Sequence, residues 1–178
     1  MKTNAETHLQ GRRFVKFSNP LKLQKNVIEG LTLAQLDRPD LDGDTLLAGS
    51  LDDWLEAVTQ IAALIAHDAQ QCIGAFCDFA IAEGLLTATA RILDPEAMEE
   101  QIERGDYGGI SIGFMAMPAD TQRKRQGYEF RKVKITEASF VKRPAHQAAR
   151  FVKSCEDQTD SDLLNMERLK TFFEGIRI

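Results

Sequence analysis

Three side chains of this 178-residue chain are of the types that carry out nucleophilic catalysis. Ser111 is flanked by glycines in the pentapeptide GISIG at 109–113, which matches the letters of the G-x-S-x-G nucleophile elbow. His67 follows an apolar run, and a neutral imidazole is the natural acceptor for the proton of a serine hydroxyl if a third group fixes its tautomer. Glu137 is an acid within an apolar segment. Residues of these types could support hydrolysis through a serine nucleophile.

The sequence around Ser111 does not predict an elbow, which is a strained turn between a strand and a helix. Ser111 lies between two β-branched isoleucines in an apolar run over 108–117 that ends at Pro118, and such a run is typical of a strand. The chain also lacks the repeated β-α-β units of an α/β-hydrolase. We therefore expect Ser111 inside a strand, where a neighbouring glycine can also mark a bulge or a close backbone approach.

His67 and Glu137 each have a structural interpretation beside the functional one. A single histidine after an apolar run is more often a hydrogen-bonded structural residue than a general base. Burying a carboxylate is costly unless it is paired, so Glu137 either points to solvent or holds a partner. The alternation of its strand favours solvent. The residue types alone leave these alternatives open.

The elements that would position these residues are predicted to be mostly strands, from apolar runs bounded by turn residues. The runs begin near Arg12 and continue at 27–36, 71–81, 85–93, 108–117, 128–134 and 135–141. Glu83 and Gly84, between the runs at 71–81 and 85–93, predict a tight antiparallel hairpin. The run at 61–66 either continues a preceding helix or forms a buried strand, and periodicity does not distinguish the two.

Helices are predicted from their capping residues. Ser50 with Asp53 three residues later resembles a capping box and predicts a helix over about 51–60. Asp94, followed by a proline at the first helical position, predicts a second helix that stops at Gly105. The predicted fold class is α+β: a largely antiparallel β domain of six or more strands with two or three short helices.

Length and composition exclude several classes of protein. The chain is long enough for one domain, and its longest apolar run is far shorter than the roughly 20 residues of a membrane span. The polar N-terminal residues show no apolar segment of a secretory signal. Cys72, Cys77 and Cys155 have no CxxC spacing and are interpreted as free thiols in a reducing compartment. We expect no membrane association, no metal and no cofactor.

The net charge of −5 hides two oppositely charged segments. Residues 37–106 contain 16 acidic and 3 basic side chains, whereas residues 121–153 contain 10 basic and 2 acidic ones. The basic run at 123–125 lacks interleaved aromatic residues, so it is typical of a solvated loop rather than of a specific nucleic-acid surface. Opposite charges could pair within the domain or between subunits, and we expect self-association.

A turn rich in aspartate lies between the first two predicted elements. Asp40, Asp42 and Asp44 alternate as in a calcium loop, but Leu51 occupies the twelfth position, where an EF-hand needs a glutamate. Turn formers stand at nearly every position of 37–44. We therefore favour a turn over a metal site.

Several segments, taken in order, carry a resemblance to a known family. They are His67-Asp68 after an apolar run, GISIGF at 109–114, EASFV at 137–141 followed by Pro144-Ala145, and the turn DLDGD at 40–44. His67 and Ser111 are 44 residues apart, and Ser111 and Glu137 are 26 apart. Over about residues 26–152 the chain resembles the prohead (procapsid) maturation proteases of tailed phages.

The resemblance implies a fold and three site residues. The family is similar in fold to the herpesvirus assemblin proteases, so it implies a barrel-like, mostly antiparallel β domain. It implies Ser111 as nucleophile, His67 as general base and Glu137 as the orienting acid. Assemblins use a histidine as third member, and His146 lies nearby. We favour Glu137, because it occupies the strand position before a small apolar run.

The same resemblance implies support for the oxyanion and a biological role. Lys142 or Arg143, just after the third member, could orient a donor toward the developing charge. The implied function is a serine endopeptidase that cleaves scaffold and major capsid protein precursors, and itself, inside a procapsid assembling in the host bacterial cytoplasm. The alternative is an inactive scaffolding or structural protein on the same fold.

The expected domain organisation has three parts. A disordered N-terminus covers 1–11, the protease domain covers 12–153, and a polar linker with an amphipathic helix covers 154–178. The apolar face of that helix is predicted to consist of Leu163, Met166, Leu169 and Phe173.

Overall fold

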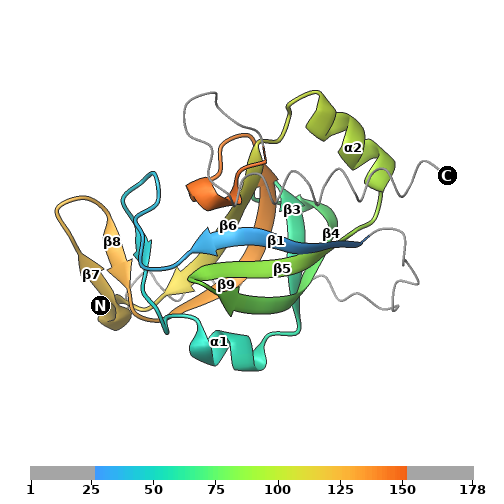
Figure 1. Cartoon of the computed structure of the whole chain (residues 1–178). Helices are drawn as coiled ribbons and strands as arrows, with labels where there is room; N and C mark the ends of the chain where they lie inside the picture. The colour runs from blue at the N-terminus through green and yellow to red at the C-terminus, as the bar shows by residue number, and fades with distance from the viewer. Residues whose placement is uncertain (1–26, 152–178) are drawn as a thin grey trace, which may run out of the picture.

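The computed structural model describes residues 27–151 of the chain, mostly as strands (Figure 1). The strands are β1 Val27–Gln35, β2 Thr45–Leu46, β3 Gln60–Ile65, β4 Asp68–Ala82, β5 Leu85–Ile92, β6 Gly109–Ala116, β7 Thr121–Arg123, β8 Tyr128–Phe130 and β9 Val133–Val141. The α-helices are α1 Asp52–Ala57 and α2 Pro95–Glu103, and the 3-10 turns are η1 Pro118–Asp120 and η2 Gln147–Ala149. The expected strand near Arg12, the N-terminal tail and the C-terminal amphipathic helix lie outside the described residues.

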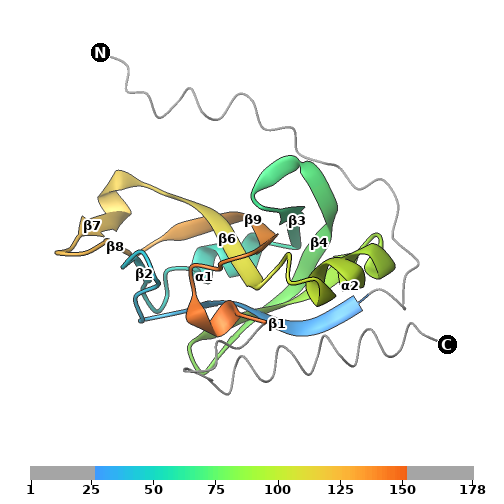
Figure 2. The ribbon, with the colours of Figure 1, turned by 90° about the horizontal axis from the view of Figure 1, so that it is seen from above.

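The main sheet has six strands in the order β1-β5-β4-β3-β9-β6 and is curled into a half-barrel. Neighbouring strands are antiparallel except β3 and β9, which are parallel. A small second sheet, β2-β8-β7, lies at the opposite end of the molecule from α2 (Figures 1 and 2). The predicted fold class, mostly antiparallel strands with a few short helices, is confirmed.

Two tight hairpins connect β3, β4 and β5. Glu83 and Gly84 both have positive φ, 53° and 76°, and join β4 to β5 as predicted. Ala66 and His67 also have positive φ, 49° and 61°, and form the two-residue connection between β3 and β4. Positive φ at both central positions is the signature of a type I′ turn. The ambiguous run at 61–66 is thus a strand, which β4 and β9 flank on its two edges.

The helix α1 is shorter than predicted and is not held by a capping box. Leu51 is the N-cap without a side-chain hydrogen bond, and Val58 is already extended because the chain enters β3 two residues later. The buried Ser50 hydroxyl has no hydrogen-bond partner among the described residues. Trp54 fixes the helix instead, since its indole N–H donates to the Ile135 carbonyl of β9 at 3.0 Å.

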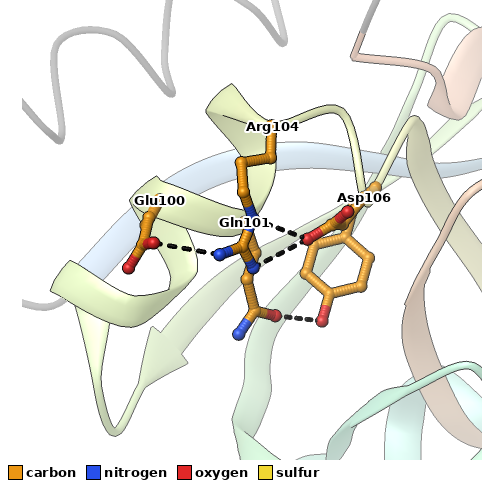
Figure 3. A network of polar contacts seen from close by, with 5 residues as sticks. Glu100, Gln101, Arg104 and Asp106 are labelled. Atoms are coloured by element: carbon orange, nitrogen blue, oxygen red, sulfur yellow. Dashed lines mark hydrogen bonds and ion pairs between the residues drawn. The ribbon is translucent and has the colours of Figure 1, made fainter.

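The helix α2 matches its prediction, because Asp94 Oδ1 accepts the Ala97 N–H at 3.1 Å and caps the N-terminus. At the C-terminal end of α2, Arg104 contacts both Glu100 and Asp106 at 2.9 Å (Figure 3).

Tyr107, which follows Asp106, is buried. Its hydroxyl donates to Gln101, and its ring packs edge-on against Phe140. These contacts fix where the chain leaves α2 and enters β6.

Candidate active site

The register of β6 against β9 brings two of the expected residues, Ser111 and Glu137, onto one face of the sheet. Ser111 is directly opposite Ser139, and Gly113 is directly opposite Glu137. Opposite residues of an antiparallel pair project on the same side, and so do residues two apart on one strand. Ser111 therefore shares a sheet face with Glu137 and Ser139. Ser111 is 9% exposed and lies within β6, as the sequence predicted.

His67 reaches Glu137 from the hairpin after β3. The distance from His67 Nδ1 to Glu137 Oε1 is 2.7 Å, and the side chains are 43% and 11% exposed respectively. The expectation from alternation that Glu137 points to solvent is wrong. The carboxylate lies against Gly113 of the neighbouring strand β6, and the imidazole gives it the partner that burial requires.

The contact with Glu137 changes the acid–base behaviour of His67. The hydrogen bond to the carboxylate raises the pKa of His67 above its ordinary value, although partial burial opposes the shift. An ionised carboxylate only accepts hydrogen bonds, so Nδ1–H is the donor and Nε2 is left with its lone pair. This is the tautomer that a general base for a serine hydroxyl needs.

Ser111 and His67 are related through Glu137, which shares a sheet face with Ser111 and contacts the imidazole, and not by a direct bond. Within residues 27–151 no hydrogen bond joins the Ser111 hydroxyl to the imidazole. Catalytic hydrogen bonds are often long in unliganded enzymes and tighten when substrate binds. The geometry therefore contains an oriented imidazole–carboxylate pair and a serine on the same face.

His146, the other candidate for third member, has a different partner. Its Nδ1 faces the backbone N–H of Gln35 on β1 at 3.5 Å. The ring is buried, and desolvation lowers the pKa of His146. His67 Nδ1 is bonded to Glu137, so His146 makes no hydrogen bond to it in the described part of the chain.

Lys142 and Arg143 lie just past the end of β9. Both residues are exposed. Val141, the last residue of β9, is opposite Gly109, the first residue of β6. Lys142 and Arg143 therefore follow β9 at the end of the sheet where β6 begins. Neither makes an ion pair in the described part of the chain.

The aspartate-rich turn uses its carboxylates to hold backbone. Asp40 Oδ1 accepts the N–H groups of Asp42 and Asp44 at 2.9 Å, and Asp44 Oδ1 accepts that of Tyr128 at 2.8 Å. The Asp40 bonds hold the turn itself, and the Asp44 bond links it to the first residue of β8. Among residues 27–151 no group of three or more His, Cys, Asp or Glu side chains is arranged to hold a metal ion. Cys72 and Cys77 are free thiols.

Two residues of the site were not identified from the sequence. Ser139 is fully buried, and its hydroxyl donates to Glu137 Oε2 at 2.6 Å while accepting the His67 backbone N–H at 3.0 Å. Gly113 leaves the space that the Glu137 carboxylate occupies. The EASFV segment contains Ser139, and its two-residue spacing from Glu137 on a strand is the signal that could have indicated a shared face.

The Gly113→Ala substitution is expected to displace the Glu137 carboxylate. An added Cβ would lie 1.9 Å from Glu137 Oε1 and 2.8 Å from its Cδ, so the contact with His67 cannot persist. Overpacking of this kind destabilises a protein by about 1–3 kcal/mol. Denaturant unfolding should show that loss, and the raised pKa of His67, followed by NMR of its ring protons, should fall.

A double-mutant cycle supplies the control for Gly113. In a Glu137→Ala background the carboxylate is gone, so the same glycine substitution should cost much less stability. Equal costs in the two backgrounds would show that the clash with Glu137 is not what limits position 113.

Comparison with known proteins connects this geometry to a family. No curated protein sequence matches the chain. Among solved structures, the bacteriophage T4 capsid assembly protease gp21 is similar at a TM-score of 0.48 and 10% identity, over 64% of this chain and 90% of that one. The KSHV protease in complex with a hexapeptide phosphonate inhibitor is similar at 0.49 and 12%, over 82% and 76%. The family model described as "Caudovirus prohead serine protease" matches residues 25–162, so the chain belongs to the caudovirus prohead serine protease family.

Proposed function

We propose that the chain is a serine endopeptidase in which Ser111 is the nucleophile, His67 the general base and Glu137 the orienting acid. The observation that carries the proposal is the 2.7 Å contact between His67 Nδ1 and Glu137 Oε1, on the sheet face that Ser111 shares. Family membership supports the reaction class.

The proposed reaction follows from the roles of the three groups. Ser111 Oγ attacks the scissile carbonyl and its proton moves to His67 Nε2. The imidazolium that forms is stabilised by Glu137 and then protonates the leaving amine. Water, activated by the same imidazole, hydrolyses the acyl-enzyme and regenerates the serine. Lys142 or Arg143 is the candidate to support the negative oxygen of the tetrahedral intermediates.

The proposed substrates are the coat-protein and scaffold precursors of a phage procapsid, together with the chain itself. Ser111 lies on β6, the last strand of the main sheet, whose outer edge is bridged at its first residue, Gly109, by Arg150. An extended peptide can pair with the edge of β6 beyond that bridge and bring its carbonyl to the serine. Action inside the assembling procapsid, and self-association there, belong to the same proposal. Within residues 27–151 no helix has both the length and the apolar character of a membrane span.

Co-expression with the coat-protein precursor tests this function. Intact-mass analysis should find a shortened coat protein with the native chain and the full-length precursor with Ser111→Ala. Ser50→Ala is the matched control, since the Ser50 hydroxyl is buried and has no hydrogen-bond partner among the described residues. Full-length precursor with every variant, the native chain included, would support the inactive scaffolding alternative.

The pH dependence of cleavage should report the raised pKa of His67. A general base must be neutral, so kcat/KM should increase as pH rises through a pKa above the ordinary value of about 6.5. Because the carboxylate causes the shift, Glu137→Gln should move the acid limb of the profile to lower pH. A profile whose acid limb lies below pH 6 in the native chain would contradict the assignment of His67.

The same pKa has the opposite effect on stability. A folded-state pKa raised above the unfolded value means that the His67–Glu137 pair stabilises the fold fully below the unfolded pKa of His67 and loses this contribution as pH rises through the folded pKa. As pH rises through the pKa of His67 in the folded chain, proteolysis is therefore expected to increase, while the contribution of the His67–Glu137 pair to stability decreases.

A further inference from the structure

Ser139 links His67 and Glu137 in a closed ring of hydrogen bonds. The backbone N–H of His67 donates to Ser139 Oγ at 3.0 Å, and the Ser139 hydroxyl donates to Glu137 Oε2 at 2.6 Å. The other carboxylate oxygen, Oε1, contacts His67 Nδ1 at 2.7 Å. The ring begins at the backbone of His67 and returns to its side chain, so it fixes both relative to Glu137.

The packing around Ser139 gives no other reason for a hydroxyl. Ser139 is 0% exposed in the middle of β9, between the buried Ala138 and Phe140. A buried hydroxyl needs partners. Both partners of this one belong to the His67–Glu137 pair, and the hydroxyl makes no other bond within residues 27–151.

The hairpin that carries His67 requires an anchor. Ala66 and His67 have φ of 49° and 61°, a region that costs roughly 1–2 kcal/mol per residue for side chains other than glycine. The Ala66 N–H donates to the Phe140 carbonyl at 3.0 Å, and the next N–H donates to Ser139. Two consecutive residues of β9 thus hold the strained turn in place.

We propose that Ser139 is a positioning residue of the active site, which orients the Glu137 carboxylate and anchors the His67 backbone at the same time. This inference rests on the proposed function, in which His67 and Glu137 act on Ser111. Ser139 does not touch the substrate. It acts by keeping Oε1 aimed at Nδ1, so that the imidazole holds the tautomer and direction that proton transfer from Ser111 requires.

A pair of isosteric substitutions separates the hydroxyl from the shape of the side chain. Ser139→Thr keeps the hydroxyl and adds a methyl group, whereas Ser139→Val has the same shape without the hydroxyl. Both are β-branched and suit a strand. Ser139→Ala removes the hydroxyl without adding volume, and serves if the larger variants do not fold.

The first measurement is the rate at which a fluorophosphonate labels Ser111, because it needs no knowledge of the cleavage site. Labelling forms an Oγ–P bond, expels fluoride and transfers the serine proton to His67. Loss of a hydrogen bond to a charged group should slow labelling about 10-fold to 100-fold in Ser139→Val and Ser139→Ala. Ser139→Thr should stay within about 3-fold of the native rate if the hydroxyl alone decides.

The second measurement is the NMR titration of the His67 ring in a Ser111→Ala background, which does not depend on activity. Glu137 is the charged group that raises the pKa of His67. In Ser139→Val and Ser139→Ala the carboxylate is no longer held, so that pKa should fall toward its ordinary value, and in Ser139→Thr it should stay raised. His146 titrates separately, because desolvation lowers its pKa.

The outcomes distinguish this inference from the proposed function. Equal labelling rates and equal His67 titrations in the native chain and in folded Ser139→Ala or Ser139→Val would overturn the role of Ser139. Labelling that persists in Ser111→Ala would instead overturn Ser111 as nucleophile, while the titration would still test whether Ser139 holds Glu137 and His67 together.

Discussion

Replacement of Ser111 by alanine, or of His67 by alanine, is expected to lower proteolysis by roughly 10⁴-fold or more. In the proposed mechanism the serine supplies the atom that attacks, and the imidazole of His67 accepts its proton. Residues of a triad act as a unit, so the double variant should lose little beyond either single one. Cleavage of the purified coat-protein precursor, followed by intact mass over time, measures the effect.

Both variants should fold, which separates chemistry from stability. Ser111→Ala leaves the contact between His67 and Glu137 untouched. His67→Ala leaves the carboxylate with the Ser139 hydroxyl, which donates at 2.6 Å. Circular dichroism and thermal unfolding should therefore show native strand content in both. Substantial cleavage by folded Ser111→Ala would exclude the serine mechanism.

Glu137→Gln is expected to have the second largest effect, about a 10⁴-fold loss in kcat with a small residual rate. An amide can turn a donor toward His67 Nδ1, which favours the wrong tautomer of the imidazole. Nucleophile and base remain in place, so activity should be reduced but measurable. The measurement is the rate of precursor cleavage at saturating substrate, across a range of pH.

His146→Ala is the matched comparison for Glu137, because His146 is the alternative third member. Its ring is buried against β1 and its Nδ1 faces the Gln35 N–H, so the substitution should lower the free energy of unfolding. The activity of the folded fraction should be nearly native. An inactive His146→Ala together with an active Glu137→Gln would reverse the assignment and favour the arrangement of the assemblins.

The elements predicted correctly are those that short stretches of sequence determine. Glu83 and Gly84 define a hairpin because the turn needs two residues of positive φ, and one of them is glycine. Asp94 caps α2 through a bond to a residue three positions on. The capping box at Ser50 was wrong, because the N-cap is the next residue, Leu51, whose side chain has no polar atom to accept a hydrogen bond.

The turn that carries His67 could not be predicted in this way. Ala66 and His67 are not the Asn-Gly, Asp-Gly or Gly-Gly pair that marks a type I′ hairpin, so the local sequence does not indicate one there. Bonds from β9, far along the chain, hold the turn instead. Strain of this kind is common at functional sites, where the surrounding structure maintains a conformation that the local sequence disfavours.

The residues of the proposed site were named from the sequence, but the strand register that arranges them could not be predicted. Residue types and family resemblance indicated Ser111, His67 and Glu137, and the contact between the last two is present. That Glu137 is buried, and that Gly113 and Ser139 surround its carboxylate, depends on the register between β6 and β9. Register describes how two strands align, so the alternation of residues within one strand does not predict it.

The parallel pairing of β3 with β9 also determines when the contact between His67 and Glu137 can form during folding. His67 and Glu137 are 70 residues apart in sequence, and His67 and Ser139 are 72 apart. Contacts of such long range require the closure of a large loop, and pairings of this kind are intrinsically slow to form. The hairpins of β3, β4 and β5 can form earlier from local contacts. Until β9 has been synthesised and has docked beside β3, His67 therefore has no carboxylate to orient it, and the proposed general base is incomplete.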